Sequence, residues 1–234
     1  MSGLAARFLR SACLTFASRR IHILSKPNTV KCLTTSTRFF SSQADRQFNQ
    51  ILTNEIQEEK ENAFTCSPPK GFKVVETNGS EVVIRKEYPD GLFVDIDINL
   101  AGSIYPGASE DSENPEDAAT LEARPEFRIK LTKSSGRSLT FNCSFPGPEL
   151  TKDFSEDDPN YPTYSVDSIG MERVPGYFVY TDLLDEKMFD HSIKLLLERG
   201  LDADFQQELQ DFCTSEEHKL YLKFLDEFQK YCKE

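Results

Sequence analysis

The residues with the clearest capacity for acid–base chemistry are two histidines that each follow an acidic residue. His191 follows Asp190, and His218 follows Glu217. Both pairs lie where apolar residues recur at helical spacing. Adjacent side chains on a helix point about 100° apart, so neither carboxylate can orient the imidazole beside it. No Ser or Cys stands in a nucleophile elbow or another activating context. We therefore predict that both histidines are ordinary helix residues at a packing interface, and that the protein is not an enzyme.

Clusters of acidic residues are the other feature with possible chemistry. Glu156, Asp157 and Asp158 are consecutive and could bind divalent cations weakly, but they lack the spaced oxygen ligands and the fixed Gly of an EF-hand loop. The chain also has no GxGxxG or GxxxxGK[ST] motif, which argues against a nucleotide site. We expect no cofactor and interpret the acidic clusters as solvated surface. Calcium buffering remains the alternative function.

The charges of the chain fall into two blocks. The first 42 residues contain seven Lys or Arg and no Asp or Glu, whereas the remainder contains 20 basic and 39 acidic residues. A basic, Ser- and Thr-rich segment without acids is typical of a mitochondrial transit peptide. Arg38, Phe40 and Ser41 fit a matrix-processing pattern, so we predict a transit peptide over residues 1–42, cleavage between Phe40 and Ser41, and a location in the mitochondrial matrix. The alternative is a basic arm that stays attached and binds nucleic acid or lipid.

Residues 43–234 have the length of one domain and a formal charge of −19. Such a chain repels phosphate backbones and anionic lipid surfaces, whereas basic proteins are natural partners. No apolar run approaches the roughly 20 residues that span a bilayer. We therefore expect basic protein partners, no direct binding of nucleic acid and no membrane span.

Four cysteines remain in this domain, and they form neither a CxxC pair nor a metal-ligand spacing. The matrix keeps thiols reduced, so we predict that all four are free. Cys143 lies on the apolar side of an expected strand, where burial is the default. The four are Cys66, Cys143, Cys213 and Cys232.

The expected elements are a helix, then strands, then helices. Residues 45–62 place apolar residues at helical spacing and predict an amphipathic helix. Around 93–100, 127–132 and 139–145 the apolar residues alternate with polar ones, which is typical of an antiparallel sheet covered on one face. Asn78-Gly79, Asp90-Gly91 and Ser134-Ser135-Gly136 are turn sequences and predict hairpins. Weaker strand signals follow at 164–169 and 177–180.

Two acidic insertions interrupt this meander. Residues 105–124 contain six acids and one base, and residues 149–163 contain five acids and one base. Both segments lack the apolar content needed to order themselves, so we predict mobile, solvated loops. These loops supply the predicted partner-binding residues, which are Glu110, Asp111, Glu113, Glu116, Asp117, Glu156, Asp157 and Asp158.

Helical periodicity returns from residue 182. A first apolar stripe ends near Gly200, and Asp202 can cap a second helix whose stripe continues to Tyr231. We predict that this helix pairs with the amino-terminal one, that both cover the apolar sheet face, and that they help to form the contacts of an obligate homo-oligomer. The residues expected in this seam are Phe48, Ile51, Leu52, Ile56, Tyr221, Phe224, Leu225 and Phe228.

Residues 189–200, followed by Phe205, Glu208-Leu209 and 217–225, resemble the carboxy-terminal signature of the mitochondrial acidic matrix protein family. This family is also called the mitochondrial glycoprotein family, and it includes the protein that binds the globular heads of a complement component. The resemblance extends to the helix at 48–56, the acidic loops and the strand at 139–145. The chain departs from many relatives in having no Trp near Glu186.

The resemblance implies an α+β fold in which a strongly twisted seven-stranded antiparallel sheet is flanked by an amino-terminal helix and carboxy-terminal helices. It also implies a ring-shaped homotrimer without enzymatic activity. Members of the family are associated with mitochondrial translation, ribosome assembly and oxidative phosphorylation. We therefore expect a matrix adaptor or chaperone that binds basic clients such as ribosomal or RNA-binding proteins.

Overall fold

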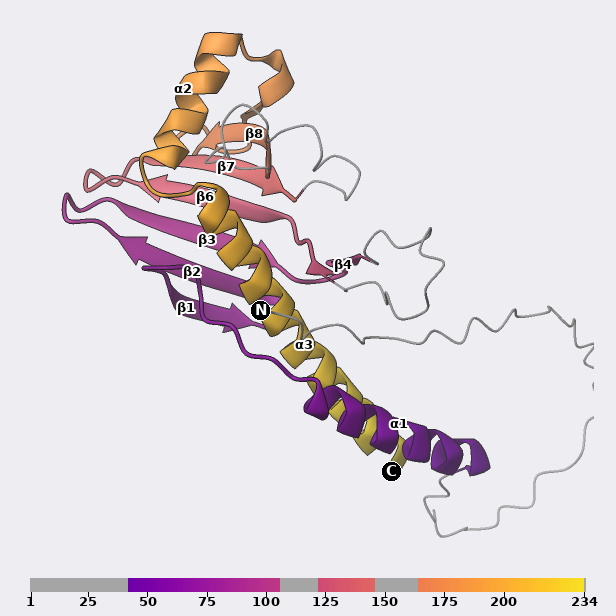
Figure 1. Ribbon diagram of the computed structural model, residues 1–234. Coiled ribbons are helices and arrows are strands. Elements are labelled where there is room, and N and C mark those ends of the chain that lie inside the picture. Colours follow the sequence, from indigo (N-terminus) through magenta and orange to yellow (C-terminus); the bar gives the residue numbers. More distant parts are fainter. Residues whose placement is uncertain (1–41, 106–121, 146–163, 234) are drawn as a thin grey trace, which may run out of the picture.

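The computed structural model describes residues 42–105, 122–145 and 164–233 (Figure 1). One helix precedes the strands, and two helices follow them. In chain order the elements are α1 (Gln43–Glu61), β1 (Lys73–Asn78), β2 (Glu81–Glu87), β3 (Phe93–Asn99), β4 (Ile104–Tyr105), β5 (Glu122–Ala123), β6 (Phe127–Thr132), β7 (Ser138–Ser144), β8 (Ser165–Met171), β9 (Phe178–Tyr180), the 3₁₀ helix η1 (Thr181–Leu183), α2 (Glu186–Leu197) and α3 (Ala203–Lys233).

The main sheet has seven strands in the order β1-β2-β3-β6-β7-β8-β9, and every neighbouring pair is antiparallel. The predicted turns join β1 to β2, β2 to β3 and β6 to β7. Gly79, Gly91 and Gly136 have positive φ angles there, which only glycine adopts without strain. This arrangement confirms the predicted seven-stranded antiparallel sheet flanked by helices.

The inner face of the sheet forms the main hydrophobic core. Ile84, Ile96, Ile129 and Phe141 are opposite one another in register on β2, β3, β6 and β7, and all four are fully buried. The residues of α2 and α3 that pack on this face are Ile193, Leu196, Phe205, Leu209 and Phe212. The alternating pattern read from the sequence therefore places apolar residues under the helices and leaves the other face open.

The ends of α2 and α3 follow the sequence signals. Asp185 caps α2 by accepting a hydrogen bond from the Met188 amide, and Gly200 follows α2 with a φ of 70°. The carboxylate of Asp202 accepts the Phe205 amide at 3.1 Å. The predicted stop at Gly200 and the predicted cap at Asp202 are thus confirmed.

The amino-terminal helix lies beside the carboxy-terminal half of α3, and both project beyond the sheet (Figure 1). A second, small hydrophobic cluster holds them together. It consists of Leu52, Ile56, Leu225 and Cys232, with Tyr221 and Phe228 packed against it. The prediction that both terminal helices cover the sheet was wrong for α1, because α2 and the first half of α3 already cover the apolar face.

The other predicted seam residues lie towards the outside of the helical arm formed by α1 and the carboxy-terminal half of α3. Phe48 packs edge-on against Phe228, with ring centroids 4.9 Å apart. Ile51 is 60% exposed and Phe224 is 57% exposed, so neither belongs to the contact between the two helices. The apolar stripe of each helix is therefore wider than its partner covers.

The boundaries of one predicted loop need correction. β4 and β5 pair as a two-stranded ribbon, so residues 104–105 and 122–123 are not loop. Ala123 is fully buried, and its amide donates to the Thr214 hydroxyl on α3. The apolar Ala123 and the hydrogen bonds to α3 order this end of the segment, although its composition is acidic overall.

Cys143, Cys213 and Cys232 are buried, Cys66 is partly exposed, and all four thiols are free. Burial raises the pKa of the Cys143 and Cys213 thiols far above the ordinary value, which keeps both protonated. Among the described residues, no helix combines the length and apolar character that crossing a bilayer requires.

Candidate functional site on the open face of the sheet

The open face of the sheet carries polar side chains in register. Asp97 on β3 lies between Val83 on β2 and Arg128 on β6, and Asn142 on β7 follows Arg128. On β1 and β8 the same end of the sheet carries Glu76 and Asp167. This pattern follows from the strand period of two, because the residues between the buried ones must face solvent.

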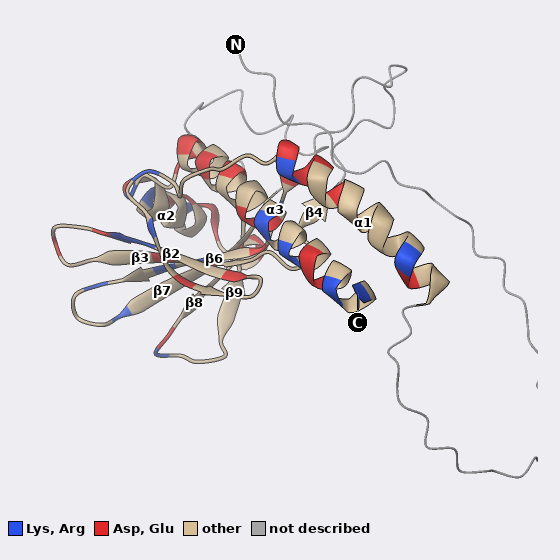
Figure 2. Ribbon diagram, turned by 90° about the horizontal axis from the view of Figure 1, so that it is seen from below, with Lys and Arg blue, Asp and Glu red and all other residues tan. Residues whose placement is uncertain are grey.

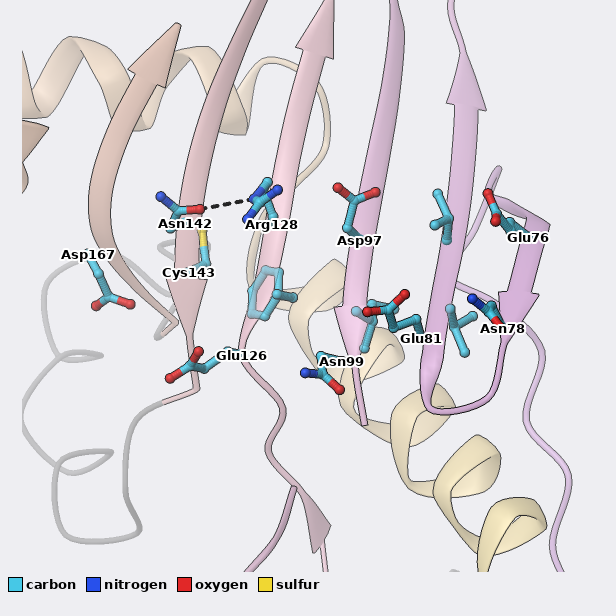
Figure 3. Close-up of a pocket in the computed structure, with 14 residues that line it drawn as sticks. Glu76, Asn78, Glu81, Asp97, Asn99, Glu126, Arg128, Asn142, Cys143 and Asp167 are labelled. Atoms are coloured by element: carbon cyan, nitrogen blue, oxygen red, sulfur yellow. Dashed lines mark hydrogen bonds between the residues drawn. The ribbon is translucent and has the colours of Figure 1, made fainter. Parts of the chain in front are cut away.

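These residues line a groove of about 580 Å³ (Figure 3). The groove crosses the sheet from β1 to β8 at the end where β3 finishes and β6 begins. It is lined by Glu76, Asn78, Glu81, Val82, Val83, Asp97, Ile98, Asn99, Glu126, Phe127, Arg128, Asn142, Cys143 and Asp167.

Five of the lining residues are carboxylates, and only one is a cation. None of the five makes a direct ion pair with another described residue. The guanidinium of Arg128 instead donates to the amide oxygen of Asn142 at 3.1 Å, and the Asn142 amide donates to the Ser168 hydroxyl at 2.8 Å. The groove therefore presents negative charge that the surrounding side chains leave largely uncompensated.

Asp97 is the most enclosed of these carboxylates. Burial raises its pKa above the ordinary value. The charges of Arg128 and Lys130 oppose the shift, and those of Asp95 and Glu76 add to it. A cation placed beside Asp97 would relieve the repulsion from these neighbouring acids. The groove is thus suited to bind an ammonium or guanidinium group.

The neighbouring part of the same face is different, because its charges are paired. Arg85 donates to both carboxylate oxygens of Asp95, at 2.6 and 3.0 Å, and lies 4.5 Å above the Phe93 ring. Lys130 pairs with Glu172 at 3.5 Å. Unpaired acid is therefore a property of the groove and does not extend over the whole open face.

Neither predicted histidine takes part in this groove. His191 is exposed, and its Nδ1 donates to the Lys187 carbonyl of the same helix at 2.8 Å. His218 is buried at the contact of α1 with α3, where its Nε2 lies 3.1 Å from the carboxylate of Glu59. The structure thus places His218 at a packing interface, but its partner is Glu59 and not the adjacent Glu217.

The pair of Glu59 and His218 is enclosed, with each residue 3% exposed. Burial raises the pKa of Glu59 to about 7, and the nearby charges of Glu55, Glu217 and Glu58 act in the same direction. Burial lowers the pKa of His218. Both shifts favour the neutral forms, so near neutral pH the two side chains share one proton across the seam.

All eight acids predicted to bind partners lie outside the described residues, as do Phe40 and Ser41 at the predicted cleavage site. Sequence reasoning missed the acids of the groove, which belong to ordered strands and their ends. The signal was present in the alternation of Asp95 and Asp97 with apolar residues, but only the register shows which acids share a face. Among the described residues, no group of three His, Cys, Asp or Glu side chains is placed to hold a metal ion.

No family model matches the chain. Its curated relatives include the protein named complement component 1 Q subcomponent-binding protein, mitochondrial. The Rattus norvegicus protein is 28% identical over 233 residues, which cover 93% of this chain and 81% of the relative. The Homo sapiens protein is 28% identical over 81% of this chain and 72% of the relative.

Solved structures include a Leishmania major protein described as a sequence homologue of human p32 protein. It has a TM-score of 0.56 and 13% identity, and the match covers 81% of this chain and 99% of that structure. This likeness shows the fold. Together with the curated relatives, it confirms the predicted resemblance.

Proposed function

We propose, on the premise that this chain is a homologue of the mitochondrial complement component 1 Q subcomponent-binding proteins, that it is a non-enzymatic adaptor or chaperone that holds basic proteins. The observation that carries the proposal is the groove on the open face of the sheet, where five carboxylates lack ion-pair partners among the described residues. A basic segment of a client would supply the missing cations.

The strength of such binding depends on the number of contacts. One exposed ion pair contributes about 0 to 1 kcal/mol and is screened by salt. Several Lys or Arg residues must therefore bind together, which the groove permits because its acids are spread over β1, β2, β3, β8 and the approach to β6. Binding by this mechanism is multivalent and strongly dependent on ionic strength.

The proposed clients are ribosomal or RNA-binding proteins, which need protection of their basic segments before they meet RNA. The homologues are named mitochondrial, and the basic segment at residues 1–42 supports import into the matrix as a cleaved transit peptide. We place the protein in the support of mitochondrial translation, ribosome assembly or oxidative phosphorylation, with the acidic segments at 105–124 and 149–163 as further contact regions.

Self-assembly as a homotrimer belongs to the same proposal. Apolar side chains are exposed on the helical arm, at the β9 edge of the sheet, on β1 and on α2. Covering such patches with a neighbouring subunit would remove them from water. The exposed residues of the first two places include Ile51, Phe224 and Tyr231 on the arm, and Tyr177, Tyr180 and Leu183 at or beside β9.

The test uses an arginine-rich peptide and a variant that neutralises three acids of the groove. Glu76→Gln, Glu126→Gln and Asp167→Asn together should weaken binding about tenfold at low salt, because each lost pair removes several tenths of a kcal/mol. The matched control is Glu58→Gln, Glu186→Gln and Asp190→Asn, which removes the same charge from exposed helix positions. Equal weakening by both triple variants, or affinity that does not change with salt, would contradict the proposal.

The same titration distinguishes calcium buffering. If the acids serve to bind divalent cations, millimolar Ca²⁺ should displace the peptide far better than sodium at equal ionic strength, and calorimetry should show saturable Ca²⁺ binding. If they serve to bind basic proteins, the two salts should differ little.

A further inference from the structure

A second cavity lies at the opposite end of the strands, on the face that the helices cover. It has a volume of about 270 Å³ and lies between the turn from β6 to β7, the end of β8 and the last turn of α2. Its walls are largely apolar, with Ser138 as the one uncharged polar residue, and the apolar residues are Leu92, Leu131, Leu139, Met171 and Leu195. No aromatic side chain lines it, so it offers no stacking surface for a base or another flat ring.

Three cations surround this apolar cavity, and no carboxylate lines it. They are Lys133 and Arg137, on either side of the β6 to β7 turn, and Arg199 after α2. No described acid forms an ion pair with Lys133 or Arg137. Two neighbouring cations without an acidic partner are unexpected in a domain with a formal charge of −19. Their mutual repulsion would be relieved by an anion.

Arg199 is held in place from two sides. Its backbone carbonyl accepts hydrogen bonds from the Tyr88 hydroxyl and from the Lys86 ammonium, both on the β2 side of the cavity. Its guanidinium donates through Nη1 to the Leu195 carbonyl, and lies 4.0 Å from Glu198. The Arg199 Nε is buried and has no hydrogen-bond partner among the described residues. A fixed guanidinium that retains unused donors is a favourable anchor for a carboxylate.

We propose that this cavity binds a medium-chain carboxylate, such as a fatty acid of about ten carbons. The alkyl chain would lie against the leucines, and the head group would meet Arg199, with Lys133 and Arg137 adding attraction. The cavity is slightly smaller than the usual 300 to 1,000 Å³ of drug-sized sites, which favours one alkyl chain over a two-chain lipid or a nucleotide. This inference does not depend on the groove or on the proposed function.

The probe is decanoate, titrated into the full chain by calorimetry below micelle-forming concentrations. We expect saturable binding of one decanoate per chain. Hexanoate, which is four methylenes shorter, should bind about 250-fold more weakly, because each buried methylene contributes roughly fourfold. Decyltrimethylammonium, which carries the opposite head-group charge, should not bind.

Two variants test the anchor independently of folding. Arg199→Gln should weaken decanoate binding about tenfold or more, since a charge-assisted contact is lost. Lys133→Gln with Arg137→Gln changes only exposed turn residues and should weaken it several-fold without a change in melting temperature. The control Lys187→Gln, on the first turn of α2, should bind within twofold of the unchanged protein.

Four outcomes would overturn the inference. One is the absence of saturable decanoate binding. Another is equal affinity for decanoate in the unchanged protein and in both cavity variants. The third is equal binding of decanoate and decyltrimethylammonium, which would indicate an apolar surface that does not select the charge of the head group. Binding of an acidic, leucine-containing peptide in preference to decanoate would likewise replace the proposal with a protein-docking site.

Discussion

The two cavities of this sheet have opposite character. The groove lies on the open face at the end of the strands marked by Asn99 and Asp167, and carboxylates line it. The second cavity lies on the covered face at the other end, beside Leu131 and Met171, and has apolar walls and three cations. The net charge therefore does not describe the surface of this protein. Strand register and helix packing place acidic residues around one cavity and basic residues around the other.

Solvent exposure explains much of the difference. The open face needs no apolar residues, so its acids can converge without a cost to packing. At the covered face, cations are tolerated only at the rim, where the helix ends and the turn begins. Figure 2 shows a related division along α3, where acidic residues dominate the first half and lysines are concentrated towards the carboxy-terminal end. That order is favourable for the helix dipole.

The largest expected effect comes from damaging the scaffold that both cavities share. Ile129 on β6 is fully buried in the central row of the core. Ile129→Ala should destabilise the domain by about 2 to 5 kcal/mol and lower its melting temperature by roughly 5 to 15 °C. Thermal unfolding followed by circular dichroism measures this. An unchanged melting temperature would mean that the sheet core is misplaced.

A change in the helical arm should separate folding from assembly. Phe228 is half-buried against Phe48, so Phe228→Asp should cost about 2 kcal/mol or more through partial burial of an unpaired charge. Phe224 is exposed, so Phe224→Asp should change the stability of a single chain by only about 0.5 kcal/mol or less.

Light scattering on the same variants tests the proposed trimer. If Phe224 lies in a subunit contact, Phe224→Asp should dissociate the oligomer while the fold remains intact. A stable monomer at micromolar concentration for the unchanged protein would remove the assembly proposal. Phe224→Asp and the unchanged protein should bind the arginine-rich peptide and decanoate with equal affinity, because Phe224 lies in neither cavity.

The pair of Glu59 and His218 gives the arm a dependence on pH. The raised pKa of Glu59, about 7 against an ordinary 4.5, stabilises the fold fully below pH 4.5, and this stabilisation is lost as pH rises through 7. The lowered pKa of His218 stabilises the fold above its ordinary pKa of 6.5, and that contribution is lost as pH falls through the lowered value. Below pH 6.5 the contributions of Glu59 and His218 to stability change with pH in opposite directions. Above pH 6.5 only the contribution of Glu59 still changes.

Raising the pH from 6.5 to 8 should therefore lower the stability of the unchanged protein by about 1 kcal/mol. Glu59→Gln should remove this fall, whereas Glu61→Gln, at an exposed position at the end of α1, should retain it. Urea unfolding midpoints at both pH values measure the change. The same slope in all three proteins would show that Glu59 is not the titrating group.

The smallest expected effect concerns the single cation of the groove. Arg128→Gln removes the only positive charge among the lining residues, so it should strengthen binding of an arginine-rich peptide about two- to fivefold. It should leave decanoate binding at the other cavity unchanged. Weaker peptide binding would show that Arg128 contacts the ligand or holds Asn142 in the required position.

Much of the fold could be predicted from local patterns. The alternation around Ile96, Ile129 and Phe141 fixed the buried face, and the glycines at 79, 91 and 136 fixed the hairpins. The place of α1 could not be predicted, because its apolar stripe fits a sheet or another helix equally well. Only the completed packing of α2 and α3 shows that the sheet has no room for it.

The sites depended on contacts between distant residues. Glu59 and His218 are 159 positions apart, so the sequence offered only Glu217 as a partner for that histidine. Likewise, Glu76 and Asp167 line the same groove from strands that are five pairings apart, whereas the acids of the predicted loops are close together in the sequence. Composition therefore showed that the domain is acidic, but it did not show which acidic residues lie close together on the folded sheet.

Photo-cross-linking can locate the site at which basic clients bind. An arginine-rich peptide with a photoreactive residue at its centre is bound to the full chain at low salt and illuminated, and the attachment sites are located by mass spectrometry. If basic clients bind the groove, the peptide should attach to β1, β3 and β8 and to the start of β6, near Glu76, Asp97, Arg128 and Asp167. Attachment confined to residues 105–124 and 149–163, or to the helices, would contradict it.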